Sequence, residues 1–175
     1  MREPIKILVK NQELTLEGIQ QYYINLNNDN DKYETIKDIF SKISVAQCII
    51  YCNSTLRVDD LYNAMIQDQY PVCKIHSNMN KEERQKNFQD FLNGNYRVLI
   101  SSNLTARGID IQQVSTVINS DIPNCIHTYL HRIGRSGRFG RKGLGINLIT
   151  NKDVKKLKEI ESFYKTEIRE LPENF

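Results

Sequence analysis

Short apolar runs alternate along this chain with stretches in which apolar residues recur at helical spacing. Dense apolar runs bounded by polar residues predict buried strands at 19–26, 47–53, 71–76, 97–101, 116–119 and 145–150. Helical spacing predicts helices at 31–43, 54–65, 80–93, 127–133 and 152–168. This alternation predicts an α/β fold with a mainly parallel sheet and helices on both faces.

Polar residues mark several of the predicted helix ends. Ser54 and Asn80 can cap the helices that follow them, because their side chains accept hydrogen bonds from free backbone N–H groups. Gly94 is a suitable stop for the helix before it. The last helix should turn one stripe to the core and another to solvent. The core stripe is Val154, Leu157, Ile160, Phe163 and Tyr164, and the solvated lysines are Lys152, Lys155, Lys156 and Lys158.

Chain length and cysteine pattern indicate one intracellular domain. The 175 residues suffice for one hydrophobic core, with 1–15 predicted as an irregular linker or arm and 16–175 as the domain. The four cysteines form no CxxC pair, so buried free thiols are expected and a zinc site is not. The sequence has neither an apolar run of about 18 residues nor a signal-peptide pattern, so we expect a soluble protein.

Basic residues gather in one short segment, although the formal charge of the chain is only +3. Residues 131–142 (HRIGRSGRFGRK) hold five arginines and lysines and three glycines. Glycines let a backbone approach a ligand, and arginine forks suit phosphate. Arg132, Arg135 and Arg138 recur every third residue, which on a helix or tight turn projects them in nearly one direction. A basic helix end favoured by the dipole would explain one or two cations, but not this array.

A second polar segment, residues 101–110 (SSNLTARGID), follows a predicted strand. In parallel sheets, function gathers in loops at the carboxyl ends of strands. The hydroxyls here could hold a phosphate backbone, and Asp110 could accept a hydrogen bond from a ribose hydroxyl. By itself this segment is also ordinary loop composition.

Four segments together resemble motifs of the DEAD-box RNA helicases. Residues 49–54 (IIYCNS) resemble motif IV, 101–110 motif V, 117–123 (VINSDIP) the motif that follows, and 131–140 motif VI. Their order and spacing agree over essentially the whole chain. The flanking segments 7–10, 13–19 and 140–143 narrow the resemblance to the subgroup of translation initiation factor four-A and its exon-junction relative.

The resemblance implies a single RecA-like domain, the C-terminal half of an ATP-dependent RNA helicase. The implied catalytic residues are Arg135 and Arg138, as arginine fingers at the γ-phosphate, and His131, which couples the nucleotide to the opposite domain. The implied ATP-binding residues are Gly108, Asp110, Arg135 and Arg138. The implied RNA-binding residues, which contact the sugar-phosphate backbone, are Ser54, Arg84 and Ser102.

The resemblance also implies what this chain needs from elsewhere. The sequence has no G-x-x-x-x-G-K-[ST] loop and no Asp-Glu-Ala-Asp, so ATP and Mg²⁺ should be held by an N-terminal RecA-like domain. By itself the chain should have negligible ATPase and unwinding activity. The other expected partners are RNA, bound without sequence preference, and scaffold proteins of translation or messenger-RNA processing. We expect a monomer without membrane contact, in the cytoplasm rather than the nucleus.

The chain departs from the family pattern at three places. Residues 102–103 are Ser-Asn where Thr-Asp is usual in motif V, and residues 76–78 are His-Ser-Asn where His-Gly-Asp is common. Residues 55–56 are Thr-Leu where relatives often carry basic side chains. We expect these changes to tune RNA affinity rather than abolish it.

Two other functions stay open: a non-catalytic RNA- or protein-binding scaffold on the same fold, and a DNA-directed helicase. Retention of Arg135 and Arg138 favours the enzyme, because a scaffold has no need of γ-phosphate ligands. His127 and His131 lie four residues apart on a predicted helix, but no Glu or Cys completes a metal site, so none is expected.

Overall fold

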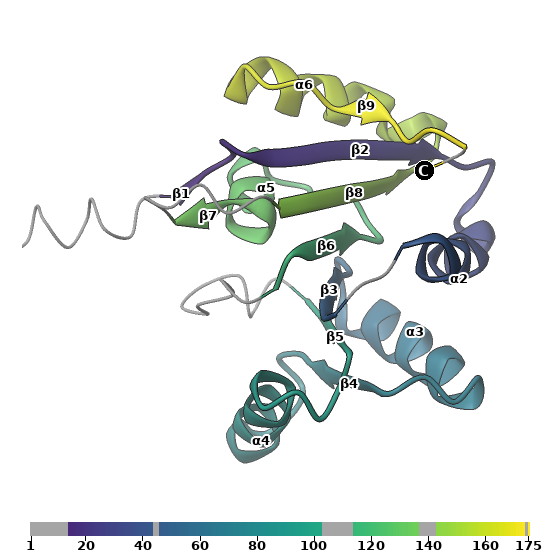
Figure 1. Cartoon of the computed structure of the whole chain (residues 1–175), viewed down its shortest axis with the longest axis vertical. Helices are drawn as coiled ribbons and strands as arrows, with labels where there is room; N and C mark the ends of the chain where they lie inside the picture. The colour runs from purple at the N-terminus through teal and green to yellow at the C-terminus, as the bar shows by residue number, and fades with distance from the viewer. Residues whose placement is uncertain (1–13, 44–45, 103–113, 137–142, 174) are drawn as a thin grey trace, which may run out of the picture.

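A sheet of seven strands forms the centre of the protein (Figure 1). The computed structural model describes residues 14–43, 46–102, 114–136, 143–173 and 175. The strand order is β4-β5-β3-β6-β8-β2-β9 and its pairings are parallel, so the predicted α/β fold is confirmed. The strands are β2 (Ile19–Asn25), β3 (Cys48–Tyr51), β4 (Val72–Ile75), β5 (Val98–Ser101), β6 (Thr116–Asn119), β8 (Gly143–Ile149) and β9 (Arg169–Glu170).

Helices cover both faces of this sheet, as predicted (Figure 1). One face carries α2 (Lys32–Lys42) and α3 (Thr55–Gln67), whose buried side chains share a core. The other face carries α4 (Lys81–Leu92), α5 (Ile126–Ile133) and α6 (Val154–Tyr164). The 3₁₀ turns η1 (Asp29–Asp31) and η3 (Asn151–Asp153) lead into α2 and α6.

Successive residues of the central strands enter two different cores. In β3, Ile49 and Tyr51 pack with α4, α5 and α6, whereas Cys48 and Ile50 pack with α2 and α3. All of β3 is buried, because strand side chains alternate between faces and helices cover both. The dense apolar runs of the sequence are therefore the strands of a sheet covered on both sides.

The expected helix caps form. The Ser54 hydroxyl accepts a hydrogen bond from the Arg57 N–H at 3.2 Å, which begins α3. The Asn80 side chain accepts one from the Glu83 N–H at 2.8 Å, which begins α4. Gly94 follows α4 with φ +84°, a left-handed conformation that costs glycine little. Local side-chain chemistry thus fixes these boundaries.

The two ends of the chain differ from the prediction. Leu14–Thr15 are not irregular: they form β1, which pairs antiparallel with β7 (Arg135–Ser136). Residues 1–13 lie outside the described residues, and the domain boundary after residue 15 stays a prediction. The last helix ends at Tyr164, not near residue 168, because Lys165 adopts a left-handed conformation with φ 51°. The chain then turns back, and β9 pairs with β2.

The cysteine prediction is confirmed for three residues and wrong for one. Cys48, Cys52 and Cys73 are buried free thiols. Burial raises the pKa of Cys52 to about 12, so its thiolate is not accessible at neutral pH. Cys125 is exposed, because it lies at the start of α5 outside any strand.

The stripe predicted on α6 is correct at its centre. Leu157 and Ile160 are buried, but Phe163 is 54% exposed, so assigning it to the core was wrong. Its ring packs edge-on against His127, with ring centroids 5.5 Å apart. Helical spacing does not separate Phe163 from Tyr164, and only the tertiary packing selects between them. None of the helices that the structure describes is long and apolar enough to cross a membrane.

Replacing Ile118 by Ala should lower the free energy of unfolding by about 3 kcal/mol, because the change leaves a cavity in a central strand. Ile118 has no exposed surface. Leu56→Ala is the matched control, since Leu56 is 68% exposed and its loss should cost less than about 0.5 kcal/mol. Urea denaturation of the three proteins measures the difference, and equal costs would contradict the described core.

Candidate functional site

The residues implied to bind RNA lie at the carboxyl ends of neighbouring strands. Ser54 follows β3 and is exposed, and Ser102 directly follows β5, which pairs with β3. Ser102 is 8% exposed, and its N–H donates to the Ile75 carbonyl at 3.4 Å. Arg84 lies in the first turn of α4, which begins beyond the carboxyl end of β4. The structure therefore brings the three to one edge of the sheet, as the carboxyl-end rule predicts.

The chain connections switch faces at the same edge, between β3 and β6. The chain leaves β3 toward α3 on one face and leaves β6 toward α5 on the other. Such switches in connection open a crevice at the carboxyl ends of the strands. In this protein charged side chains meet at this point, and Asp121, just after β6, bonds several of them.

Both carboxylate oxygens of Asp121 are engaged. Arg57 holds them as a fork, with Nε 2.7 Å from Oδ2 and Nη2 2.6 Å from Oδ1. Lys32 Nζ donates to Oδ1 at 2.9 Å, and the Asn53 N–H donates to Oδ2 at 2.9 Å. One carboxylate thus connects α2, α3 and the loop after β3 to the end of β6.

Arg132 of α5 completes this network from the other face. It has no exposed surface. Its Nη1 donates to Asn119 Oδ1 at 3.0 Å and to the Asp121 carbonyl at 2.8 Å. Its Nη2 donates to Asn53 Oδ1 at 2.7 Å, and the guanidinium carbon lies 5.2 Å from the centre of the Tyr51 ring. A buried cation needs such acceptors, because an unpaired charge in the interior is very costly.

The charges in this network stay ionised at neutral pH. Burial disfavours the charged form of Asp121, but the hydrogen bonds from Arg57 and the charge of Lys32 outweigh burial and hold the pKa of the carboxyl below its ordinary value. Burial lowers the pKa of the Arg132 guanidinium to about 10. The network is therefore a set of paired charges and hydrogen bonds rather than a proton-transfer site.

Arg132 is turned into the interior, whereas the side chains of Arg135 and Arg138 lie outside the described ones, so the expectation that the three project together stays a prediction. The helix ends at Ile133, and Arg135 belongs to β7, whose backbone pairs with β1. Gly134 makes the turn: a Cβ there would lie 2.6 Å from the Leu130 carbonyl oxygen, so only glycine fits.

Some of the residues implied to act at the nucleotide lie in described segments, and others lie outside them. His131 is exposed on the last turn of α5. Arg135 lies in β7, near the amino ends of β2 and β8 rather than at the carboxyl edge (Figure 1). Gly108, Asp110 and Arg138 lie outside the described residues, as do the side chain of Arg135 and the departure at Asn103. Their implied roles stay predictions.

The departure at Asn78 has a visible structural role. Its side-chain amide donates to the Thr55 hydroxyl at 3.2 Å, and its N–H donates to His76 Nδ1 at 3.2 Å. The other ring nitrogen of His76 lies 2.9 Å from Asp59 Oδ1. Asn78 therefore ties the loop after β4 to the first turn of α3, next to Ser54.

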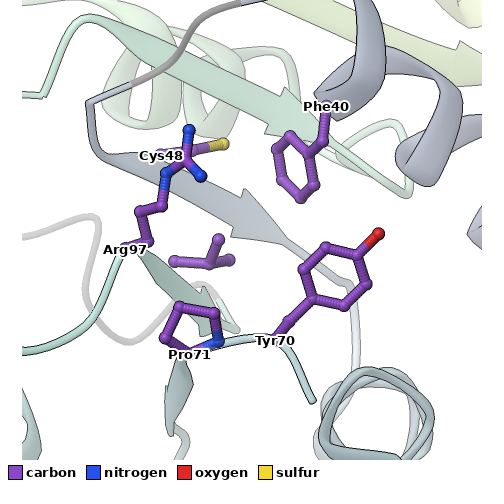
Figure 2. A pocket seen from close by; sticks show the side chains of 6 residues that line it. Phe40, Cys48, Tyr70, Pro71 and Arg97 are labelled. Atoms are coloured by element: carbon purple, nitrogen blue, oxygen red, sulfur yellow. The ribbon is translucent and has the colours of Figure 1, made fainter. Parts of the chain in front are cut away.

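Two hollows of the described surface contain none of the implied site residues. One is a cavity of about 40 Å³ between the rings of Phe40 and Tyr70, with Cys48, Pro71, Arg97 and Val98 around it (Figure 2). It lies at the amino ends of the strands and is far smaller than the roughly 300 Å³ of a ligand site. The other is an open groove beside α6, lined in part by Val154, Lys155 and Phe163. Among the described residues, no three His, Cys, Asp or Glu side chains gather as metal ligands.

Sequence reasoning missed the residues that organise this edge: Asn53, Arg57, Asp121, Lys32 and the inward Arg132. The available signal was Asn-Ser-Asp at the end of the buried strand at 116–119 and just beyond it, a position where polar side chains need partners. The partners come from segments up to 89 positions away, which no local pattern connects.

Comparison with known families and curated proteins gives consistent matches. The model of the helicase conserved C-terminal domain matches residues 31–140. ATP-dependent RNA helicase FAL1 of Saccharomyces cerevisiae is 51% identical over the whole chain, which spans 44% of that protein. Eukaryotic initiation factor 4A of Caenorhabditis elegans is 50% identical over 99% of the chain, which spans 43% of it. The chain thus covers less than half the length of these relatives.

Two solved structures of DEAD-box proteins are also similar to this chain. The C-terminal domain of the DEAD-box protein Dbp5 has a TM-score of 0.80 and 31% identity, covering 92% of this chain and 94% of that one. Saccharomyces cerevisiae Dbp5 bound to RNA and ADP BeF3 has a TM-score of 0.83 and 30% identity, covering 98% of this chain and 48% of that one.

Replacing Asp121 by Asn should lower the free energy of unfolding by about 3 kcal/mol at pH 7, because Lys32 and Arg57 then face a neutral amide. The pKa of Asp121 in the folded protein lies below its unfolded value of about 3.9. The wild type therefore keeps this contribution above about pH 4 and loses it as the pH falls through the folded pKa. Urea denaturation between pH 2 and pH 7 should show the two proteins converging in acid.

The matched control is Asp38→Asn, on the exposed side of α2. It should change stability by less than about 0.5 kcal/mol. A difference between wild type and Asp121→Asn that stayed constant down to pH 2 would show that the charge of Asp121 contributes nothing.

Proposed function

Because this chain belongs to the helicase conserved C-terminal domain family, in the form found in DEAD-box RNA helicases, we propose that it is the C-terminal half of an ATP-dependent RNA helicase of the initiation factor 4A type. In this proposal it binds the backbone of single-stranded RNA along the carboxyl edge of its sheet. It also supplies arginine fingers to an ATP site shared with an N-terminal RecA-like domain.

The observation that carries the proposal is the arrangement of Ser54, Ser102 and Arg84 beside three neighbouring strands, β3, β5 and β4. Adjacent strands lie about 4.8 Å apart, so the segments that follow these three strands lie side by side along one edge. Hydroxyls and an arginine contact phosphate and ribose without reading bases. Such contacts fit binding without sequence preference, and 2′-hydroxyl contacts favour RNA over DNA.

The nucleotide part of the proposal rests on the motif VI segment. Arg135 and Arg138 act as the arginine fingers that stabilise charge on the γ-phosphate. His131, exposed on α5, couples the nucleotide to the opposite domain, and Gly108 and Asp110 meet the nucleotide near its ribose. Dbp5, similar in structure, has been solved with RNA and ADP BeF3, which supports the proposal that a protein of this kind binds both ligands.

Magnesium is assigned to the N-terminal domain in this proposal. Asp121, the buried carboxylate nearest the RNA edge, has both oxygens on cationic groups and does not fit a magnesium ligand. The ion, when bound with ATP, would neutralise charge on the phosphates. The residues of this chain would orient the γ-phosphate and hold the RNA.

The test uses a two-domain protein, in which an N-terminal RecA-like domain of the same family precedes this chain. It should hydrolyse ATP in the presence of RNA, and Arg138→Ala should lower that turnover at least about 1,000-fold, because the finger stabilises the transition state. The control is Arg169→Ala, whose side chain is 67% exposed on β9. Steady-state ATPase assays with and without oligouridylate measure the effect.

Unchanged turnover in Arg138→Ala would remove the finger assignment. RNA binding without ATP turnover in the two-domain wild type would favour the scaffold alternative. Equal stimulation by DNA and RNA oligonucleotides would favour a DNA-directed enzyme.

A further inference from the structure

The buried guanidinium of Arg132 connects the two functional regions of the domain. It lies on the helix that leads to Arg135, and it bonds the residue that precedes Ser54. We infer that Arg132 is a positioning residue that couples RNA binding to nucleotide binding by holding these two segments in one arrangement. This inference rests on the proposed function and adds the element that links its two sites.

On the RNA side, Arg132 acts through Asn53. The Asn53 side-chain oxygen accepts from Arg132 Nη2 at 2.7 Å, and its amide donates to the Ile122 carbonyl at 2.9 Å. Its backbone N–H donates to Asp121 at 2.9 Å. These bonds restrict the movement of Asn53, and they therefore also restrict the position of Ser54, the next residue. Any shift of the guanidinium changes where the Ser54 hydroxyl and the start of α3 lie.

On the nucleotide side, Arg132 fixes the last turn of α5. His131 is its neighbour in sequence, and the chain passes through Gly134 into β7 with Arg135. The Gly134 N–H donates to the Leu130 carbonyl at 2.7 Å, which holds this turn against the end of α5. A displacement of the Arg132 end of α5 is thus transmitted to the segment that carries His131 and Arg135.

Only a guanidinium can make these contacts together. Nη1 and Nη2 donate in one plane to three acceptors on two segments: Asn119 and the Asp121 carbonyl at the end of β6, and Asn53 after β3. A lysine in this place has one donor nitrogen on a flexible stem and cannot span the same acceptors. Packed interiors shift between discrete arrangements rather than deforming smoothly, so both segments move together or not at all.

The coupling can be measured in the two-domain protein. The affinity for fluorescein-labelled oligouridylate is measured by anisotropy with and without ADP and beryllium fluoride. The affinity for that nucleotide is measured with and without RNA. In the wild type the two ratios should be equal, because coupling between binding sites is reciprocal, and typical ratios are about 5 to 150.

Arg132→Lys and Asn53→Ala should each lower both ratios about tenfold or bring them close to one. The double variant should lose no more than either single variant, since both remove the same connection. Asn53 is half-buried and Asn53→Ala keeps its backbone bond to Asp121, so this variant carries the test if Arg132→Lys folds poorly.

Tyr129→Phe is the matched control on the same helix. Tyr129 is fully buried, and its hydroxyl donates to Gln21 at 2.6 Å and accepts from Asn147 at 3.2 Å, so it is bonded to β2 and β8 rather than to the loop after β3. This variant should lose stability but keep the wild-type coupling ratios, which separates positioning from general loss of structure.

If Arg132→Lys and Asn53→Ala fold and keep the wild-type coupling ratios, the inference is overturned and the proposed function stays intact. Equal loss of coupling in Tyr129→Phe would also overturn it, because the effect would then be general softening of α5. A wild-type two-domain protein that binds neither RNA nor nucleotide would instead overturn the proposed function itself.

Discussion

A single buried charge sets the conditions for much of this domain. The guanidinium of Arg132 has no exposed surface, and a cation in a protein interior persists only where acceptors surround it. Asn119, Asp121 and Asn53 supply those acceptors, each from the carboxyl end of a strand or the loop that follows it. Satisfying Arg132 therefore fixes the relative position of the ends of β3 and β6 and of the helix α5.

This constraint also explains which side chains occupy the point between β3 and β6 where the chain connections switch faces. In open parallel sheets a switch in connection leaves space for a ligand. Here Asp121 is bonded at that point to Lys32 and Arg57, which come from the helices of the opposite face. Ser54, just beyond this network, is exposed. The polar interior thus supports the end of β3, from which the proposed RNA contact of Ser54 would be made.

The parts of the fold that depend on local physics could be read from the sequence. Doubly buried strands follow from dense apolar runs, and Ser54 and Asn80 cap their helices because the acceptor stands next to the donors it satisfies. The errors share one cause. The end of α6, the exposure of Phe163 and the strand at residues 14–15 depend on packing against distant segments. Hydrophobic periodicity identifies which side of a helix is buried, but it does not show where the surface that the helix packs against ends.

The sequence by itself determined the class of fold, the family, and the arginine-rich segment interrupted by glycines. It did so because motif order and hydrophobic alternation are properties of neighbouring residues. Only the tertiary structure decided where these arginines lie: Arg132 turns into the interior, whereas Arg135 belongs to β7. That choice depends on Asn53 and Asp121, which lie 79 and 11 positions from Arg132. Spacing along a chain places side chains on a helix, but the acceptors that draw one of them inward exist only after the sheet has formed.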